Sequence, residues 1–303
     1  MTPANDRQVK IVEVGPRDGL QNEQQPVPLA AKVALVDQLA QAGVRFIEAA
    51  SFVSPKWVQQ MADSAEVMRR IARVPGVVYS ALTPNLQGLE AALAAGCGEV
   101  AVFGAASESF SRRNINCSID ESLERFRPGV QQALAAGLPV RGYVSCVLGC
   151  PYEGAIAPEA VLQVAQKLLD IGCHEISLGD TIGRGTPVST RALLEVCLRA
   201  LPARQLAGHF HDTYGTAIAN ACAALDMGLR TFDGSVAGLG GCPYAAGASG
   251  NVASEDLVHT LHAMGFETGI DLGGLIAAGQ AITQAMGRRS GSRVAQARAP
   301  VAC

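Results

Sequence analysis

The sequence predicts an α/β protein built as a (β/α)8 TIM barrel with extra helices at its C-terminal end. Three observations support this fold. Eight short β-rich runs alternate with longer alanine-rich helical stretches from residue 9 to residue 236. The helical stretches tend to close on glycine, the residue that commonly ends a helix. The length of 303 residues, with 49% hydrophobic and 17% charged residues, suits one large barrel and excludes a disordered chain.

The expected elements follow one another in the order strand, helix, strand. The clearest helices span residues 29–42, followed by Gly43, and 158–171, followed by Gly172. The strands are short runs rich in Val, Ile, Leu and Phe, at residues 9–14, 44–49, 77–81, 99–103, 140–147, 174–178, 205–211 and 231–236.

We expect one catalytic domain over residues 1–303, with the barrel at about 8–265. After the eighth strand, a glycine-rich loop leads into a helix at about 252–264 and then into a further alanine-rich helix. The segment at about 266–303 therefore holds extra helices, and its tail from Ser290 to Cys303 is expected to be loosely held.

A doubly wound open sheet is the main alternative fold. Such sheets usually have fewer strands, and a glycine-rich phosphate loop often follows the first strand. The segment Gly15-Pro-Arg-Asp-Gly19 is not that loop, and neither Gly183-Arg-Gly185 nor Gly238-Leu-Gly240 continues into a dinucleotide fingerprint. We therefore reject a dinucleotide-binding fold.

The composition of the chain limits the binding partners and the cellular compartment that we expect. The net charge is −3 and no basic block occurs, so we expect no nucleic-acid partner. No apolar run reaches membrane-spanning length, and the first residues lack the apolar core of a signal peptide, so we expect no membrane partner. The nine cysteines are odd in number and lack zinc-finger spacing, which indicates reduced thiols in a cytoplasmic protein.

Polar residues gather at one end of the expected strands. The starts of the strands carry little besides Val, Lys10 and Arg141. In barrels of this kind the active site lies at the C-terminal ends of the strands, so that end is the expected catalytic face. There the sequence places Arg17-Asp18, Glu48, Asp180, His209-Phe-His211 and a glycine-rich loop that ends at Asn251.

His209 and His211 form the sharpest pair. Two residues apart on a strand, they project from the same face. Two adjacent imidazoles can bind one divalent metal ion, with Asp18 as an anionic third ligand. The alternatives are two core histidines bonded to backbone carbonyls and, for Asp18, the ordinary turn chemistry of Asp-Gly. Glu48 lies in an apolar strand and needs a partner, for which Arg17 is a plausible residue.

Three further polar residues allow both a structural and a functional interpretation. Asn251 could cap the following helix, Asp180 could close a loop or cap a helix, and Cys242 could be a small apolar filler. The glycine-rich loop around Cys242 can move and approach a ligand closely. None of the four lysines occupies an interior strand position suited to a Schiff base, so carbon–carbon chemistry here needs a metal as its electrophile.

Five segments stand out at the ends of the expected strands and in the loops that follow them: Val12-Glu-Val-Gly-Pro-Arg-Asp-Gly-Leu-Gln-Asn-Glu23, Ser51-Phe-Val-Ser-Pro-Lys-Trp57, Gly179-Asp-Thr-Ile-Gly183, His209-Phe-His-Asp-Thr-Tyr-Gly215 and Gly238-Leu-Gly-Gly-Cys-Pro-Tyr-Ala-Ala-Gly-Ala-Ser-Gly-Asn-Val-Ala-Ser-Glu-Asp256. They resemble the 3-hydroxy-3-methylglutaryl-CoA lyase family, which belongs to a wider group of barrel metallolyases. The resemblance runs from about residue 9 to residue 297, and its most specific part is the cysteine–glycine loop. The departures are small: Ser254 replaces the usual threonine, and Arg184 is unusual. Neither is expected to touch the chemistry.

The resemblance implies a metal site. The family's ligands map to Asp18, His209, His211 and Asn251, and the implied ion is Mg²⁺ or Mn²⁺. Oxygen ligands with two imidazoles suit such ions, whereas a thiolate ligand would favour zinc. The assignment of Asn251 as a ligand depends on the resemblance alone.

The resemblance also implies roles for the other polar residues. Arg17 maps to the residue that stabilises the enolate oxygen, and Cys242 maps to the thiol of the active-site loop. Glu48 joins the catalytic residues, while Gln21 and Asp180, together with Arg17, are assigned to substrate binding.

The implied reaction is a metal-dependent retro-Claisen cleavage of 3-hydroxy-3-methylglutaryl-CoA to acetyl-CoA and acetoacetate, a step of leucine breakdown and ketone-body formation. The base is His209 or Asp18, and Cys242 protonates the enolate. The implied partners are an acyl-CoA substrate and a second copy in a homodimer. The alternatives are a Claisen-type synthase, a lyase for longer 3-substituents, and a ligand-sensing barrel without catalysis.

Overall fold

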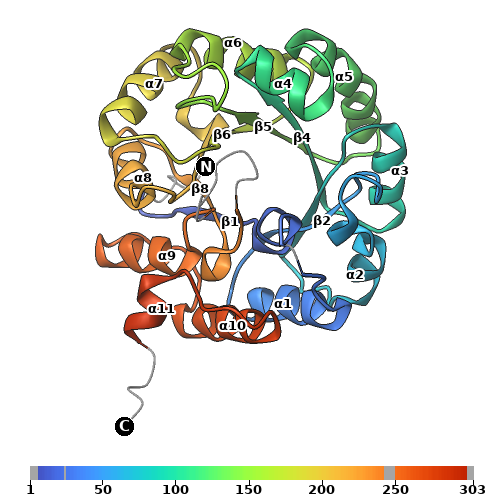
Figure 1. The fold of residues 1–303 in the computed structure, drawn as a ribbon, viewed down its shortest axis with the longest axis vertical. Helices are drawn as coiled ribbons and strands as arrows, with labels where there is room; N and C mark the ends of the chain where they lie inside the picture. The colour runs from blue at the N-terminus through green and yellow to red at the C-terminus, as the bar shows by residue number, and fades with distance from the viewer. Residues whose placement is uncertain (1–5, 24, 242–249, 299–303) are drawn as a thin grey trace.

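A closed barrel of eight parallel strands, β1 to β8 in chain order, forms the centre of the structure. The computed structural model describes residues 6–23, 25–241 and 250–298. Seen down the barrel, the strands form an inner ring and the helices an outer one (Figure 1). Strand β8 pairs back to β1, with Lys10 opposite Thr231 and Glu13 opposite Gly234. This closure confirms the predicted (β/α)8 barrel and excludes the doubly wound sheet.

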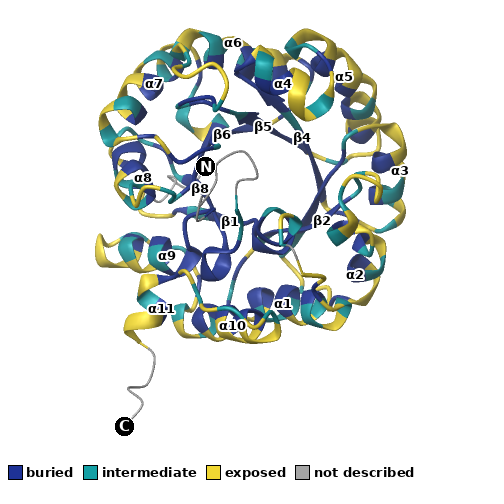
Figure 2. Ribbon diagram, viewed as in Figure 1, coloured by how far each residue is buried: buried dark blue, intermediate teal, exposed yellow. Residues whose placement is uncertain are grey.

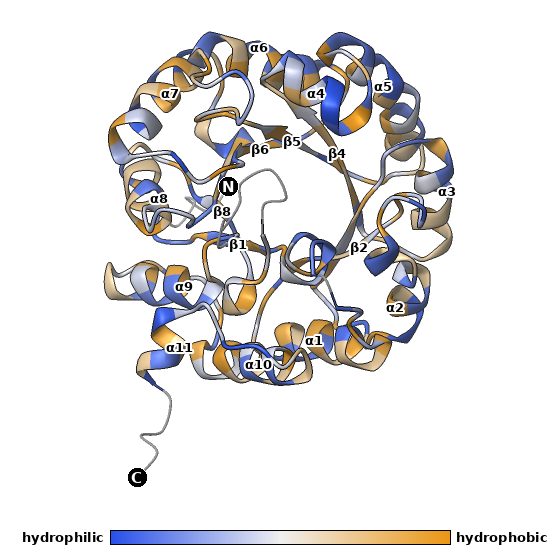
Figure 3. Ribbon diagram, in the orientation of Figure 1, coloured by the Kyte–Doolittle hydropathy of each residue, from blue (hydrophilic) through white to orange (hydrophobic). Residues whose placement is uncertain are grey.

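All eight predicted strands are present, with ends that differ by a few residues. Their side chains are buried almost throughout, as expected for parallel strands covered by helices. Figure 3 shows the apolar character of the strands at the centre. The strands are β1 (Lys10–Glu13), β2 (Phe46–Ser51), β3 (Val78–Leu82), β4 (Glu99–Ala105), β5 (Val140–Ser145), β6 (Glu175–Asp180), β7 (Leu206–Phe210) and β8 (Thr231–Gly234).

The outer helices bury one face against the barrel and expose the other (Figure 2). The predicted helix ends are confirmed at Gly43 and Gly172, whose φ angles of 92° and 117° lie in the region that favours glycine. The helices are α1 (Leu29–Gln41), α2 (Ser64–Arg70), α3 (Leu86–Ala94), α4 (Glu108–Ile115), α5 (Ile119–Ala135), α6 (Pro158–Asp170), α7 (Pro187–Ala200) and α8 (Ala217–Asp226).

Three helices follow β8: α9 (Ser254–Ala263), α10 (Leu272–Ala285) and α11 (Arg293–Ala297). In Figure 1, α10 lies beside α1, and α11 lies beside α9.

The tail was predicted to be loose from Ser290, and this is wrong as far as residue 298. Asp256 on α9 accepts hydrogen bonds from Ser292 Oγ at 2.7 Å and from the backbone amides of Arg293 and Val294 at 3.0 and 2.9 Å. This anchor lies on another helix, which is why the local sequence does not indicate it. Residues 299–303 lie outside the described part of the chain.

Within the described ranges, no helix combines the length and the apolar character needed to cross a bilayer. The seven cysteines in those ranges are free thiols.

Candidate active site and metal centre

The turn after β1 carries Arg17 and Asp18 to the C-terminal mouth of the barrel. Gly15–Gly19 forms a single π-helical turn. A Cβ on its last glycine would lie 2.7 Å from Ser235 Oγ, so only glycine lets the turn pack this closely on the segment after β8. Arg17 donates from Nε to Glu48 Oε2 at 2.7 Å and from Nη1 to Asp18 Oδ1 at 2.7 Å. The predicted Arg17–Glu48 pair is therefore present.

Asp18, His209 and His211 form one cluster. A carboxylate oxygen of Asp18 and one ring nitrogen of each histidine all lie within 4.8 Å of one another. The two imidazole centroids are 5.2 Å apart. The predicted common face of the two histidines thus places both rings beside the turn that carries Asp18.

Asn251 contacts the same cluster. Its Nδ2 donates to Asp18 Oδ2 at 2.9 Å and to the Leu239 carbonyl at 3.3 Å. Helix α9 begins at Ser254, after Ala253, so Asn251 is not the cap of that helix. The structure therefore removes the capping interpretation and places Asn251 next to Asp18.

The charges around the cluster are complementary. Burial alone favours the neutral acid, yet the positive charge of Arg17, and that of either histidine when it is protonated, lowers the pKa of Asp18 to about 2. Burial and the neighbouring His209 lower the pKa of His211 to about 4. For His209, burial opposes the charged form, but its hydrogen bond to Asp233 raises its pKa above the ordinary value. One anion and one neutral imidazole thus lie close together beside a charged guanidinium.

These side chains fit a divalent cation. His211 Nδ1 is buried and has no hydrogen-bond partner among the described residues, so a lone pair there is free for a metal. A carboxylate, an amide and two imidazoles are ligands that Mg²⁺ and Mn²⁺ accept, although imidazole also suits zinc. The interpretation of His209 and His211 as core histidines bonded to backbone carbonyls fits only the hydrogen bond of His211 to the Thr181 backbone. His209 bonds to the Asp233 carboxylate instead, and His211 Nδ1 has no partner among the described residues.

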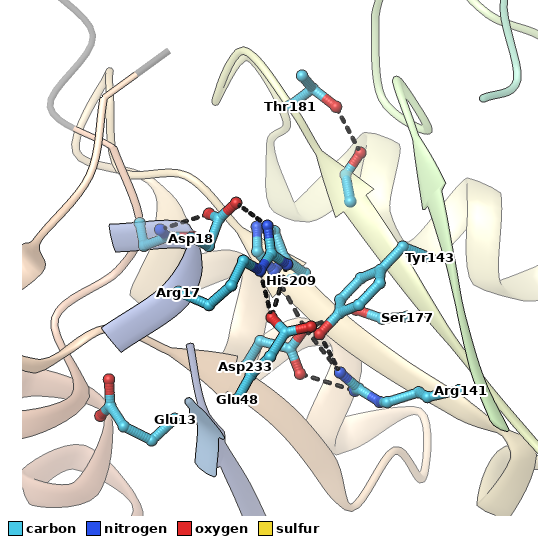
Figure 4. A network of polar contacts seen from close by, with 12 residues as sticks. Glu13, Arg17, Asp18, Glu48, Arg141, Tyr143, Ser177, Thr181, His209 and Asp233 are labelled. Carbon is cyan, nitrogen blue, oxygen red and sulfur yellow. Dashed lines mark hydrogen bonds and ion pairs between the residues drawn. The ribbon is translucent and has the colours of Figure 1, made fainter. Parts of the chain in front are cut away.

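Three charged residues of this network were not predicted. Asp233 on β8 accepts a hydrogen bond from His209 Nδ1 at 3.0 Å, and Arg141 on β5 donates to both oxygens of Asp233 (Figure 4). Glu175 on β6 in turn accepts from Arg141 Nε at 2.8 Å. Asp233 is a lone acid in an apolar strand, the same signal that singled out Glu48.

Another buried acid, Glu13, lies behind the site at the end of β1. Its Oε1 accepts from the backbone amides of Gly15 at 2.8 Å and Val236 at 2.9 Å, and its Oε2 accepts from Ser254 Oγ at 2.5 Å. Burial raises the pKa of Glu13 to about 7, although these hydrogen bonds oppose the shift. One carboxyl group thus joins the turn after β1 to the turn after β8. Ser254, a departure expected not to touch the chemistry, takes part in this structural junction.

Comparison with known proteins places the chain in a family. The HMGL-like family matches residues 8–282. A hydroxymethylglutaryl-CoA lyase from Pseudomonas mevalonii is 62% identical over 94% of this chain and 95% of its own length. The chain belongs to the hydroxymethylglutaryl-CoA lyase family. It is therefore an enzyme of the lyase class, as the five sequence segments indicated.

Two further comparisons, one of sequence and one of structure, find close similarity to hydroxymethylglutaryl-CoA lyases of Pseudomonas aeruginosa. The first finds a protein named 3-hydroxy-3-isohexenylglutaryl-CoA/hydroxymethylglutaryl-CoA lyase, which is 58% identical over 96% of this chain and 97% of its own length. The second finds the crystal structure of a hydroxymethylglutaryl-CoA lyase, with a TM-score of 0.95 and 58% identity over 96% of this chain and 97% of that one. The barrel, its closure and its extra helices are thus those of this lyase family.

Three further site residues expected from the lyase resemblance are Gln21, Asp180 and Cys242. Gln21 Oε1 is buried without a hydrogen-bond partner in the described structure. Asp180 accepts from the backbone amides of Arg184 at 3.2 Å and Gly185 at 2.8 Å, and burial raises its pKa to about 6. Its carboxyl group therefore holds the loop after β6, in line with the loop interpretation. Cys242 lies outside the described residues.

Proposed function

We propose that this chain cleaves 3-hydroxy-3-methylglutaryl-CoA to acetyl-CoA and acetoacetate in a metal-dependent retro-Claisen reaction. The observation that carries the proposal is the cluster of Asp18, His209 and His211 beside the Arg17 guanidinium. A cation site and a fixed positive charge suit the two oxygens on which charge develops, the C3 oxygen and the thioester oxygen. The names of the relatives support the same substrate.

The bond that breaks joins C2 and C3 of the substrate. His209 or Asp18 accepts the proton of the C3 hydroxyl, C3 becomes the ketone carbon of acetoacetate, and the C2–C3 electron pair moves into the thioester enolate. We assign to Cys242 the proton that C2 then receives to give acetyl-CoA. Asp18, His209, His211 and Asn251 would hold a divalent cation, which would supply Lewis-acid catalysis when bound.

Arg17 is assigned to the enolate oxygen. Its guanidinium is buried, with a side chain that is 7% exposed, and two carboxylates hold it in place. Burial opposes the charge, but Glu48 and Asp18 raise the pKa of Arg17 above its ordinary value, so the group stays charged. A donor that is already oriented needs no rearrangement as the enolate forms, and such a donor contributes about 10²–10³ in rate.

Glu48 acts through Arg17, and Gln21 and Asp180 serve the substrate. Glu48 Oε2 lies 2.6 Å from Arg17 Nη2 and so holds the guanidinium in place. The free Oε1 of Gln21 offers an acceptor to a hydroxyl or amide of the substrate. We place Asp180 at the substrate through the loop after β6, which its carboxyl group orders.

The decisive experiment is a cleavage assay on the purified full chain after removal of metal with EDTA. We expect no acetyl-CoA from 3-hydroxy-3-methylglutaryl-CoA until Mg²⁺ or Mn²⁺ is added back. Acetyl-CoA release that is indifferent to metal would contradict the mechanism. No release with either ion would leave a ligand-sensing barrel or a synthase, which the reverse condensation assay separates.

A second substrate follows from one relative. The Pseudomonas aeruginosa enzyme that is 58% identical is named for an isohexenyl as well as a methyl substrate. We propose the isohexenyl analogue as a second substrate of this chain, to be tested in competition with the methyl substrate in the same assay. A higher kcat/KM for that analogue would make the longer 3-substituent the preferred one.

We further propose that the native ion is Mg²⁺ or Mn²⁺, that the protein forms a homodimer and that it is located in the cytoplasm. The ligand types support the ions. The free thiols of the described residues support a reducing compartment. Metal analysis of the purified protein and sedimentation of the full chain test the first two, and cell fractionation tests the third.

A further inference from the structure

His209 is held by a carboxylate that is itself held on several sides. Asp233 Oδ2 accepts from His209 Nδ1 at 3.0 Å and from Ser177 Oγ at 2.7 Å. Arg141 donates to Asp233 Oδ1 from Nη2 at 2.7 Å and to Oδ2 from Nη1 at 3.2 Å. The Arg141 and Asp233 side chains are 2% and 1% exposed. Figure 4 shows Asp233 below the ring of His209, between that ring and Arg141.

The support continues toward the N-terminal end of the barrel. Arg141 Nε donates to Glu175 Oε1 at 2.8 Å, and Glu175 Oε2 accepts from Lys10 Nζ at 2.7 Å and from Thr231 Oγ1 at 3.2 Å. Lys10, Glu175, Arg141 and Asp233 thus alternate in charge along one path, which we call the ion ladder. Because Glu175 and Arg141 are each paired on both sides, and Asp233 also accepts from Ser177 and His209, Asp233 is fixed in rotation as well as in position.

The donors around Asp233 determine where the proton of His209 lies. Arg141 has only donors to offer, and an ionised carboxylate has only acceptors. A bidentate pair with Arg141 keeps Asp233 ionised, so His209 Nδ1 must carry the hydrogen in their shared bond. The neutral ring then presents a lone pair at Nε2, the nitrogen that is left for the cluster with Asp18 and His211. A ring that donates from Nδ1 and binds a cation at Nε2 has no lone pair for a proton, so of the two candidate bases Asp18 then takes that role.

We propose that Asp233 is a positioning residue that sets the tautomer and ring orientation of His209, and that Arg141 holds Asp233 for this task. The inference rests on the proposed cation site, because the orientation of His209 matters for function only if its Nε2 lone pair binds a cation there. Outer carboxylates of this kind usually matter nearly as much as the ligands that they orient. Tyr143 contacts the same ring edge-on, with centroids 6.3 Å apart, and Arg141 Nη1 donates to its hydroxyl at 3.0 Å.

The first test needs neither metal nor substrate. The chain has five histidines, so ¹⁵N-histidine labelling gives few signals, and a His209→Gln variant identifies the one from His209. In the metal-free full chain at alkaline pH, we expect the proton on Nδ1. A proton on Nε2 would overturn the proposal, whatever the enzyme proves to cleave.

The second test compares two variants that each remove one buried negative charge of the ion ladder. In Asp233→Asn, the amide oxygen should turn to Arg141, because a guanidinium cannot accept a hydrogen bond. The amide NH₂ group then faces His209 and moves the ring proton to Nε2. We expect Mn²⁺ binding, followed by electron paramagnetic resonance, to weaken about 10–100-fold.

The matched control is Glu175→Gln, one step further from the histidine, where the Arg141–Asp233 pair remains. We expect this variant to keep the wild-type tautomer and Mn²⁺ affinity. Equal weakening in both variants would assign Asp233 a general structural role, and no weakening in Asp233→Asn would also refute the proposal. If Asp233→Asn does not fold, the tautomer of the wild-type chain decides alone. Loss of acetyl-CoA production with a normal tautomer and normal Mn²⁺ binding would instead count against the proposed function.

Discussion

Replacing Glu13 with glutamine is expected to stabilise the folded protein at pH 8 and to leave its stability at pH 5 nearly unchanged. The side chain is fully buried, and burial raises its pKa from the ordinary value of 4.5 to about 7. Between these two pH values the unfolded chain releases a proton that the folded chain retains. The free energy of unfolding therefore falls as the pH rises. The shift corresponds to a loss of about 3 kcal/mol by pH 8.

Glutamine preserves the contacts that the protonated acid makes. Its Oε1 can accept from the amides of Gly15 and Val236, and its Nε2 can donate to Ser254 Oγ. Because the variant has no carboxyl group at this position, it should not suffer the loss. At pH 8 it is therefore expected to exceed the wild type by up to about 3 kcal/mol.

The assay is equilibrium urea unfolding of the metal-free full chain at several pH values from 5 to 8, followed by the helical circular dichroism signal. Glu195→Gln, at an exposed position on α7, controls for the introduction of one amide. Wild-type and Glu13→Gln curves that change in parallel across this range would refute the reasoning.

Three other predictions concern the reaction itself. Arg17→Gln should lower kcat about 10²–10³-fold with little change in KM, measured by steady-state kinetics, whereas a rise in KM alone would make Arg17 a substrate anchor. His211→Ala should weaken Mn²⁺ binding without loss of the folded state, and unchanged affinity would reject it as a ligand. Cys242→Ser should retain Mn²⁺ and substrate binding but lose most of the cleavage rate, since a hydroxyl is a poorer acid; near-normal turnover would assign the proton to another group.

The fold and the cluster of Asp18, His209 and His211 could be predicted because their signals are local. Each strand is a short apolar run, and glycine follows helices such as α1 and α6 at a positive φ. The two-residue spacing of His209 and His211 specifies one strand face. The parallel barrel then brings that face to the same mouth as Asp18.

The support behind the cluster could not be predicted because it depends on pairing across strands. Asp233, Arg141 and Glu13 each lie on a different strand, and only the barrel register decides which charges meet. Their one local signal is a charged residue within an apolar run, the argument applied to Glu48 alone. Ser254 illustrates the limit, because its hydroxyl reaches Glu13 from 241 positions along the chain.

Closure of the barrel between β1 and β8 has a consequence for biosynthesis. Asp18 and Asn251, whose side chains share a hydrogen bond, are 233 residues apart in the chain. At synthesis rates of about 5–20 residues per second, roughly 10–50 s separate their appearance on the ribosome. For most of that interval the first strand lacks its final neighbour, and Asn251, which contacts Asp18, is the last residue of the site to be made. A nascent chain is thus catalytically silent until its last quarter has emerged, and its unpaired β1 edge needs protection from aggregation for just as long.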